Sequence, residues 1–347
     1  MRNCDLARKL KTAIESGAYP PGARLPSARE LAREYGTGYL TADRALNRLA
    51  EEGWVRRIPR SGSFVCGKRN EAFLIGFSDA HFNHPAFDLA AGYLRQRILE
   101  EFRKLNCKVR LLSPEDLRDP EWLAELDLLL VAHAVDSGLR KTLEELPVPV
   151  LQFRAESVRE QPFHQVTIDL APGFAALFRR VRPERFKRLV ILTEGHELSH
   201  LRRDMALRFA AESGFAADAI ECIDTFDADY PLWTRLCREC RDTFFFTCGD
   251  MLAAGLTGVA LAEGVAVGRE LMLAGYDNLE SCGYLPFGKP LLTAVGYDRR
   301  DAAKAIAKLA HRLLAEPGDA ELRTIVSIPT RLTFRQTFPE SAGDQRA

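Results

Sequence analysis

The sequence predicts an α/β protein in which an N-terminal winged helix-turn-helix is followed by a two-lobed domain with parallel sheets. Three observations predict this fold. The first 66 residues contain closely spaced helix patterns and then an arginine-rich hairpin pattern, and from residue 72 apolar strand patterns alternate with helix patterns in two successive sets. Charge is divided as well, with 14 Lys and Arg against 7 Asp and Glu in residues 1–70 and 34 against 41 in the rest of the chain. Such a division is typical of a nucleic-acid-binding head on an acidic body, although a basic solvated surface would give the same count.

The composition is that of an ordinary globular protein. The chain has 347 residues, of which 46% are hydrophobic and 28% charged, and this is enough for more than one buried core. Its eight cysteines are scattered through core-like segments and fit a reducing compartment. The opening MRNCDLARKLK lacks the apolar segment of a secretion signal, and no apolar run approaches the roughly 18 residues of a membrane span. We expect a soluble cytoplasmic protein with no membrane partner.

Two helices are predicted before residue 36. The first carries an apolar stripe and ends at Gly17; the stripe consists of Leu6, Leu10, Ala13 and Ile14. The second is expected from Ala28 to Tyr35, because Ser27 and Glu30 have the spacing of a capping box and a glycine follows as the C-terminal stop.

A third helix is predicted from Tyr39 to Glu52, closed by Gly53. Its inward face would consist of Ala42, Ala45, Leu46 and Leu49, and its outward face of Tyr39, Leu40, Asp43 and Asn47. The short connection to the second helix forces a steep crossing, as in a helix-turn-helix. A polar outward face is what a helix needs in order to enter the major groove of DNA.

A basic hairpin is predicted after the third helix. WVRRI, PRSG and SFV have the pattern of a strand, a turn and a second strand, with Arg56, Arg57 and Arg60 at or near the tip. A basic hairpin beside a helix-turn-helix is a wing, suited to phosphates or to the minor groove. The sequence therefore favours binding to double-stranded DNA; a winged helix that contacts only proteins is the alternative.

The segments LPSARELAREYG and TADRALNRLAEEGWVRRIPRSGSFV resemble the winged helix-turn-helix of the GntR family of bacterial regulators, over about residues 5–66. The resemblance implies DNA contacts at Arg29 in the second helix, at Thr41 and Arg44 in the third, and at Gly62 at the wing tip. Together with outward-facing and hairpin residues, the predicted DNA-binding set is Arg29, Tyr39, Thr41, Asp43, Arg44, Arg57, Arg60 and Gly62.

Two positions depart from the family pattern. Tyr39 and Asp43 stand where the family commonly has arginines. An aspartate is repelled by phosphates, although it can accept a hydrogen bond from cytosine N4. We therefore expect an operator that differs from the family's usual one.

Beyond residue 72 the sequence predicts two lobes. The first set of strand patterns is FLIGFSD, KVRLLS, DLLLVAH and VPVLQF, with helices expected near residues 115–126 and 137–146. The second set restarts at HQVTIDL and continues through RLVILTEG, AIECIDTF, TFFFTCGD and ELMLAGYDN. Apolar strands that alternate with helices indicate parallel sheets covered on both faces. Ligands in such folds bind outside the carboxyl ends of the strands, so the cleft between the lobes is the predicted site.

Residues 72–337 resemble the periplasmic-binding-protein-like effector domain of the LacI/GalR regulators, through IGFSDAHFNHPAF, SHLRRDMALRFAAESG, GDMLAAG and LAGYDNLE. The resemblance implies ligand contacts at Arg154, Arg203 and Asp277. An arginine that donates and an aspartate that accepts, facing each other across a cleft, can hold the vicinal hydroxyls of a sugar. The loop after the first strand adds three predicted contacts, Asp79, His81 and Phe82.

One departure concerns the segment GDMLAAG. The family's sugar-binding asparagine is replaced here by Gly249, and we interpret the adjacent Asp250 as a helix N-cap rather than a ligand contact. This leaves a nucleoside or an amino acid as alternative ligands. An enzyme acting on a bound sugar is a further alternative, but no nucleophile and base are recognisable. CREC and HELSH are not interpreted as metal sites, and no cofactor is expected.

The predicted organisation is a DNA-binding domain at 1–66, a linker at 67–71, an effector domain at 72–338 and a flexible tail at 339–347. The linker leaves no room for the hinge helix of LacI relatives. We expect a homodimer on a palindromic operator, with repression relieved by a small molecule; activation or a corepressing ligand stay open.

Overall fold

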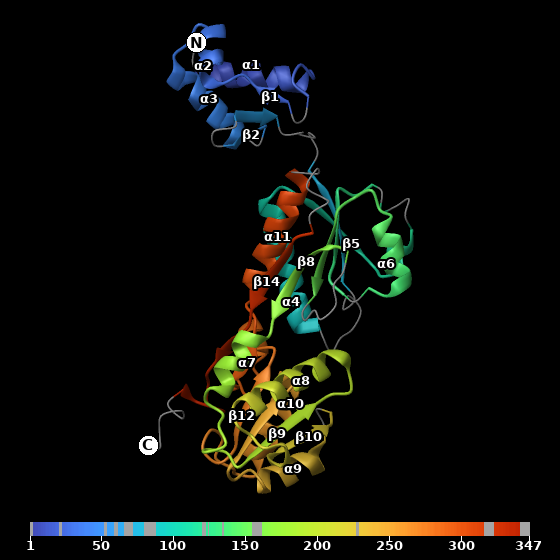
Figure 1. Cartoon of the computed structure of the whole chain (residues 1–347), viewed down its shortest axis with the longest axis vertical. Helices are drawn as coiled ribbons and strands as arrows, with labels where there is room; N and C mark the ends of the chain where they lie inside the picture. The colour runs from blue at the N-terminus through green and yellow to red at the C-terminus, as the bar shows by residue number, and fades with distance from the viewer. Residues whose placement is uncertain are drawn as a thin grey trace. The chain divides into compact units, whose positions relative to one another are not determined.

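The computed structural model describes residues 3–20, 23–51, 54–58, 62–65, 72–79, 88–119, 123, 125–133, 135–154, 162–226, 229–315 and 323–340. The chain divides into two compact units, Met1–Phe73 and Leu74–Ala347 (Figure 1). Three predicted site residues, Arg60, His81 and Phe82, lie outside the described residues, as do the linker 67–71 and residues 341–347 of the tail. Within the described ranges, no helix is both long and apolar enough to cross a membrane.

Unit 1 contains the three predicted helices, α1 (Asn3–Glu15), α2 (Ala28–Glu34) and α3 (Tyr39–Glu51). The capping box is present at the start of α2: the Ser27 hydroxyl accepts from the Glu30 N–H at 3.3 Å, and the Glu30 carboxylate accepts from the Ser27 N–H at 2.7 Å. These two hydrogen bonds with Ser27 lower the pKa of Glu30. The local sequence signal therefore fixed the helix start.

The core of unit 1 lies between the three helices. All four residues expected on the inward face of α3 are buried, namely Ala42, Ala45, Leu46 and Leu49. They pack against Leu6 and Leu10 of α1 and Leu31 of α2. The prediction of an apolar inward face on α3 is confirmed.

The wing has three strands rather than two. The hairpin consists of β2 (Val55–Ile58) and β3 (Gly62–Val65), and β1 (Arg24–Leu25) pairs antiparallel with β3. A two-residue strand is too short to show alternation, so β1 could not be predicted from the sequence pattern.

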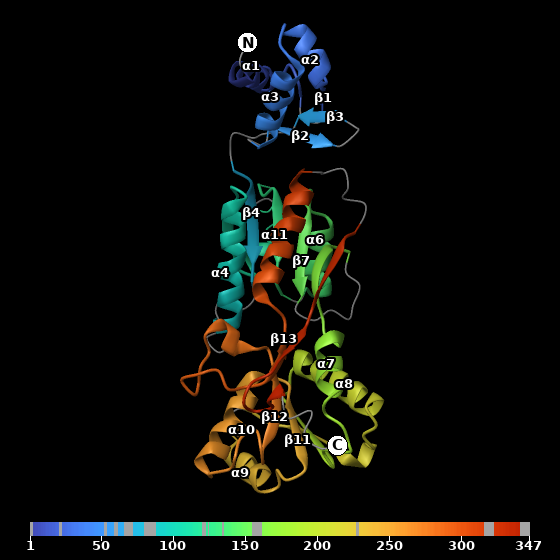
Figure 2. The same ribbon diagram turned by 90° about the vertical axis from the view of Figure 1, so that its left-hand side faces the viewer.

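The first lobe of unit 2 is built on a six-stranded parallel sheet in the order β14-β8-β7-β6-β4-β5. Its strands are β4 (Leu74–Ser78), β5 (Lys108–Leu112), β6 (Leu128–Val131), β7 (Val150–Arg154), β8 (His164–Asp169) and β14 (Ile325–Pro329). Helices α4 (Asp88–Lys104) and α11 (Arg299–Ala315) pack together on one face (Figure 2). The other core cluster includes residues of α6 (Ser137–Glu144) and of the 3-10 turn η3 (Asp116–Arg118).

The helix predicted near residues 115–126 differs at its start, where the chain forms the 3-10 turn η3 rather than an α-helix. Leu123 is α-helical, and residues 120–122 and 124 are outside the described part of the chain. The Asp116 carboxylate accepts from the Ser113 N–H at 2.7 Å, and this local bond favours a tight turn.

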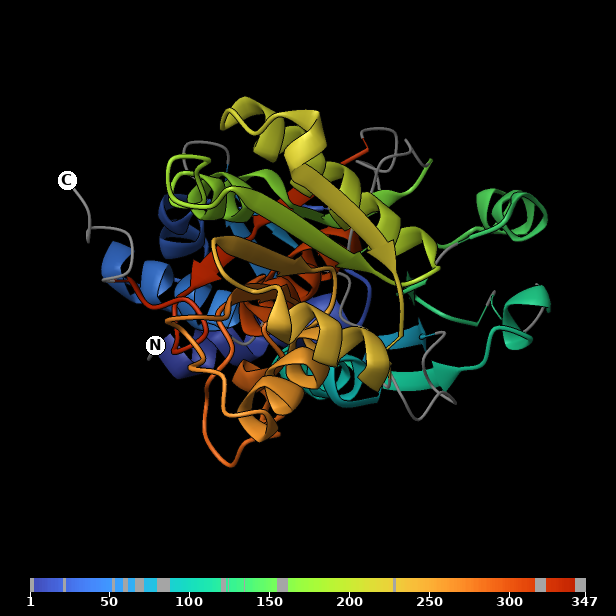
Figure 3. The same cartoon turned by 90° about the horizontal axis from the view of Figure 1, so that it is seen from below.

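The second lobe has a sheet in the order β10-β9-β11-β12-β13-β15, parallel except that β15 is antiparallel to β13. Its strands are β9 (Arg188–Thr193), β10 (Ile220–Asp224), β11 (Thr243–Thr247), β12 (Met272–Tyr276), β13 (Ala294–Gly296) and β15 (Arg331–Thr333). Helices α7 (Ala171–Phe178) and α8 (Glu197–Glu212) cover one face, and α9 (Tyr230–Arg238) and α10 (Asp250–Ala262) the other (Figure 3). Short 3-10 turns occur at η4 (Ala217–Ala219) and η5 (Leu279–Cys282).

The chain crosses between the lobes three times: after β8, after β13 and between β14 and β15. The expectation that HQVTIDL opens the second set of strands is wrong, because β8 pairs with β7 and β14 in the first sheet. The alternation of strand and helix patterns predicts the number and order of the strands, but it does not predict the sheet to which each strand belongs.

These crossings orient the two sheets. Strand β8 is parallel to the other strands of the first sheet, and the chain enters the second lobe where β8 ends. The carboxyl ends of the first sheet therefore point toward the second lobe. Strand β13 leads back into α11 and is parallel to β12, so the carboxyl ends of the second sheet point toward the first lobe. The strand ends that carry ligand sites in open α/β sheets therefore face each other.

Thr330, in the crossing between β14 and β15, contacts the crossing that follows β8. Its hydroxyl oxygen lies 2.9 Å from the Asp169 carbonyl oxygen and accepts from the Gly173 N–H at 3.0 Å. A Cβ at Gly173 would lie 2.7 Å from that hydroxyl oxygen, so only glycine allows this close approach.

Candidate DNA-binding surface and effector site

The outward face of α3 is exposed. Tyr39 and Leu40 at its start are 52% and 67% exposed, Arg44 is exposed and Thr41 is half-buried. Arg29 is exposed on α2. These predicted contacts lie where a DNA duplex could reach them, and their roles in DNA binding stay predictions.

Asp43 and Arg57 bind each other. The Arg57 guanidinium donates from Nη2 to Asp43 Oδ1 at 2.7 Å and from Nη1 to Asn47 Oδ1. The Asn47 amide in turn donates to Asp43 Oδ2 at 3.4 Å. Sequence reasoning treated Asp43 and Arg57 as separate contacts to DNA; the structure joins them in a closed ring between α3 and the wing.

Gly62 begins β3 and has φ 128°, a region that favours glycine. A Cβ there would lie 2.8 Å from Nε of Arg24, an exposed arginine on β1. Arg24 could not be placed beside the wing from the sequence, because it precedes the helix-turn-helix in the chain.

In the first lobe, the strand order reverses beside β4, and such a switch point is where open α/β sheets bind ligands. There Ser78 Oγ at the end of β4 lies 3.1 Å from Nε2 of His133, which follows β6. The Gln152 side chain of β7 donates to the His133 carbonyl oxygen at 3.2 Å. Sequence reasoning missed His133, although its position at the end of DLLLVAH could have indicated it.

Asp79 and Arg154 lie at the same edge of this sheet, Asp79 directly after β4 and Arg154 as the last residue of β7. Asp79 is 5% exposed, and its Oδ2 accepts from Nε and Nη2 of Arg95 on α4 at 3.2 and 3.1 Å. Arg154 ends β7 and is half-buried. Both residues lie at strand ends that face the second lobe, and their contacts with ligand stay predictions.

In the second lobe an arginine holds Asp277. Arg202 of α8, which is almost fully buried, lies 3.1 Å from both carboxylate oxygens of Asp277 through its two terminal nitrogens. Nη1 also donates to the Cys248 carbonyl oxygen at 2.8 Å, and the guanidinium carbon lies 4.1 Å from the centre of the Tyr276 ring. This two-pronged pair places a cation and an anion at the carboxyl ends of β11 and β12.

Arg203, the arginine that the family motif indicated, does not make this pair. Its Nε and Nη2 donate to Oδ1 of the adjacent Asp204 at 2.9 and 2.8 Å. The arginine that binds Asp277 is Arg202, which the sequence analysis did not single out; whether Arg203 contacts the ligand stays a prediction. The signal in the sequence was the buried stripe of α8, which consists of Ser199, Arg202, Ala206 and Ala210.

The backbone at Asp277 is in an unusual conformation, with φ 103°, and Asn278 after it has φ 53°. Non-glycine residues in this region are strained, and such strain concentrates at binding sites. The Asp277 carbonyl oxygen accepts from Nη1 of the buried Arg299 at 2.9 Å, and its N–H donates to the Val295 carbonyl oxygen at 3.0 Å. Asp277 is thus fixed through its side chain and its backbone.

The interpretation of Asp250 as an N-cap is wrong. Asp250 is the first residue of α10, and Gly249 occupies the cap position. Asp250 is 1% exposed, and its Oδ2 accepts from the Leu279 N–H at 2.7 Å. Burial, reinforced by the charge of Asp277, raises the pKa of Asp250 well above its usual range. A Cβ at Gly275 would lie 2.3 Å from Asp250 Oδ1, so this glycine makes room for the buried carboxyl group.

This raised pKa predicts a pH-dependent stability. The unfolded carboxyl group titrates near pH 4 and the folded one at higher pH, so the free energy of unfolding should fall as the pH rises above about 4 toward the folded pKa. Asp250→Asn keeps an acceptor for Leu279 without titrating. Urea unfolding at several pH values should show a smaller decline for Asp250→Asn than for the wild type. Parallel declines would contradict a raised pKa at Asp250.

The remaining motifs have structural roles. His196 caps α8 by accepting from the Ser199 N–H at 3.2 Å, and its Nε2 lies 3.0 Å from Oε2 of Glu194. In CREC, Cys237 and Cys240 are buried, and burial raises the pKa of Cys237 to about 11. Among the described residues there is no group of three or more side chains suited to a metal ion.

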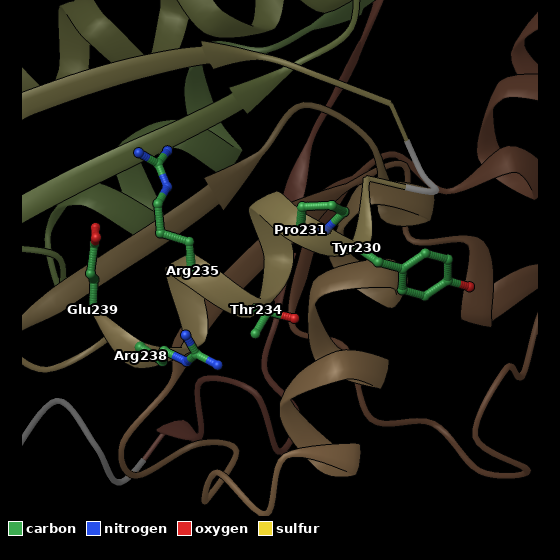
Figure 4. A pocket seen from close by; sticks show the side chains of 6 residues that line it. All are labelled: Tyr230, Pro231, Thr234, Arg235, Arg238 and Glu239. Carbon is green, nitrogen blue, oxygen red and sulfur yellow. The ribbon is translucent and has the colours of Figure 1, made fainter.

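Two surface pockets lie apart from the predicted ligand residues. One, of about 520 Å³, lies along α9 and is lined by Tyr230, Pro231, Thr234, Arg235, Arg238 and Glu239 (Figure 4). The other, of about 350 Å³, lies between α7 and β15. Neither is lined by any of the predicted ligand contacts, so the candidate effector site rests on the facing strand ends.

Comparison with known proteins finds a family match within each unit. Residues 4–65 match the family described as bacterial regulatory proteins, gntR family, and residues 179–338 match the periplasmic binding protein-like domain. The chain thus joins a GntR-type helix-turn-helix domain to a periplasmic-binding-protein-like domain.

Two individual proteins that match part of the chain are transcriptional repressors. The HTH-type transcriptional repressor NagR of Bacillus subtilis is 36% identical over 73 residues, which are 21% of this chain and 30% of that protein. A histidine utilization repressor of Pseudomonas aeruginosa is 31% identical over 137 residues, which are 40% and 49% of the two chains. The chain thus spans less than half the length of these relatives.

The structural similarity lies in the larger unit's fold. A LacI family transcriptional regulator from Enterococcus faecium, solved with bound ribose, superposes with a TM-score of 0.61 at 18% identity, over 77% of this chain and 98% of that chain. At this identity the likeness supports the fold alone, and it confirms the predicted two-lobed architecture.

Proposed function

We propose that the protein is a transcriptional regulator that binds operator DNA through unit 1 and a small effector between the lobes of unit 2. The observation that carries the proposal is the presence, on one chain, of a GntR-type domain with an exposed recognition helix and a two-lobed domain whose strand ends face each other. The matched relatives are named as repressors and regulators rather than enzymes, which favours a binding function and repression.

The effector class that the site supports best is a sugar. Asp277 offers carboxylate oxygens and Arg202 guanidinium N–H groups at one strand edge, and His133 with Ser78 offers polar groups at the other. Hydroxyl groups both donate and accept, so they match such a mixture. The ribose in the E. faecium structure supports this class. A nucleoside, which contains a ribose, is the second candidate.

Coupling would work through the relative placement of two DNA-binding heads. A single winged helix reads few base pairs, so we propose a cytoplasmic homodimer on a palindromic operator. Closure of the lobes about the three crossings would shift the dimer geometry. A coupling free energy of about 1–3 kcal/mol would change operator affinity by roughly 5- to 150-fold.

DNA binding is tested with Arg44→Ala on a duplex selected from a random-sequence pool. We expect this substitution to weaken binding at least fivefold, because an exposed arginine on the recognition helix is suited to base contact. Arg269→Ala on unit 2 removes the same charge and should leave binding unchanged. Raising salt from about 50 to 200 mM should weaken wild-type binding steeply. A flat salt response, or selection of no duplex, would count against the DNA-binding function.

A further inference from the structure

The ring of hydrogen bonds between Asp43, Asn47 and Arg57 connects two elements of unit 1 that would approach DNA separately. Asp43 and Asn47 are four residues apart on α3, so they lie on the same face of the helix. Arg57 lies two residues after the buried Val55 on β2, so its side chain leaves the strand on the side of the helix core. Helix and strand thus direct these three side chains to one place.

Each side chain of the ring forms a hydrogen bond with the other two. Both terminal nitrogens of Arg57 have an oxygen acceptor, both oxygens of Asp43 have a donor, and the Asn47 amide uses its nitrogen and its oxygen. Asp43 and Arg57 form an ion pair, with 2.7 Å between Asp43 Oδ1 and Arg57 Nη2, and their side chains are 26% and 35% exposed. An arginine held in this way has less freedom to follow a phosphate, and the charge of the aspartate is offset by its bound arginine.

We propose that Asp43, Asn47 and Arg57 form a clamp that fixes the wing on the recognition helix, and that Asp43 and Arg57 are positioning residues rather than DNA contacts. This inference rests on the proposed function and deepens it. It explains why an aspartate can stand on a helix that faces phosphates: its charge is neutralised within the domain. The reading of bases is left to other exposed positions of α3.

The test is a double-mutant cycle with Asp43→Ala, Arg57→Ala and the double variant in the full-length protein, on the duplex selected by the wild type. Each single substitution should weaken binding by about fivefold, in line with one exposed ion pair, and the double should lose no more than the weaker-binding single. The charge-exchanged Asp43→Arg/Arg57→Asp variant should bind within about threefold of the wild type. Additive losses would overturn the clamp.

Two further measurements separate positioning from contact. Arg57→Ala should keep the slope of log affinity against log salt, whereas Arg29→Ala, which removes a cation at a predicted contact with a phosphate or a base, should reduce it by about one. Asp43→Ala should keep the base preference at every position of the duplex. A reduced slope for Arg57→Ala would make Arg57 a phosphate contact, and a changed preference at one base pair would make Asp43 a base contact; either result overturns the proposal.

The same cycle without DNA keeps the two proposals apart. Backbone amides of β2 should exchange with solvent several-fold faster in each single variant than in the wild type. In the double variant they should exchange no faster than in the single variants. If the wild type selects no duplex but the exchange rates are coupled, the proposed function fails while the clamp stands as a structural unit. If binding is found but exchange is unchanged in both single variants, the clamp fails and the regulator stands.

Discussion

Arg335→Met is expected to lower the free energy of unfolding of unit 2 by about 3–5 kcal/mol, the usual result of breaking a buried ion pair. Arg335 Nε lies 3.2 Å from the carboxylate of Glu280, whose side chain is fully buried. The guanidinium also donates to Asn278 Oδ1 at 2.7 Å and to the Leu292 carbonyl oxygen at 2.6 Å. Removing it leaves a buried carboxylate that, within the described part of the chain, accepts from the backbone N–H groups of Leu291 and Leu292.

Chemical denaturation of the purified protein measures this effect, and Arg331→Met is the matched control. Arg331 is four residues away on the same segment, but its side chain is 66% exposed and its partner Asp301 lies 3.6 Å away. Exposed pairs of this kind contribute about 0–1 kcal/mol, so Arg331→Met should change stability little. Adding Glu280→Gln to Arg335→Met should recover part of the loss. Equal losses for the two arginine variants would show that burial of Glu280 is not the cause.

Arg202→Ala is expected to weaken effector binding by about 10- to 150-fold, while Arg203→Ala changes it less than threefold. Arg202 holds both carboxylate oxygens of Asp277 at the strand ends, whereas Arg203 binds Asp204. The two variants remove the same side chain at adjacent positions of one helix. They therefore separate the arginine that the structure brings to the site from the one that the family motif indicates.

The effector is first found by thermal unfolding of the wild type against pentoses, hexoses, uronic acids, small glycosides, nucleosides and amino acids. A ligand at a hundred times its dissociation constant stabilises the folded state by about 2.7 kcal/mol, which gives a shift of several degrees. The ligand that produces a shift is then titrated into both variants. If Arg203→Ala loses ligand binding and Arg202→Ala retains it, Arg203 is the ligand contact, as the family resemblance implies. A shift with amino acids alone would remove sugars as the effector class.

The sequence by itself determined most of the helices and strands of this protein and their order. Local signals were sufficient for α2, because the capping box is made by residues three apart, and for α3, because its buried stripe follows the helical period. Apolar runs likewise located most strands, since parallel strands buried on both faces are apolar along their whole length. Family motifs placed Asp277 at the end of β12.

Tertiary structure alone decided which of these pieces meet. Strand β8 joined the first sheet because pairing depends on neighbours from distant parts of the chain, and β14 returned to the same sheet about 160 residues later. Arg202 rather than Arg203 meets Asp277 because one residue on a helix turns a side chain by about 100 degrees, which a degenerate motif does not resolve. Asp43 and Arg57, fourteen residues apart, became partners only when the wing packed beside α3. Periodicity is a property of neighbouring residues, whereas a site is made by contacts between elements, so most elements could be predicted and the contacts could not.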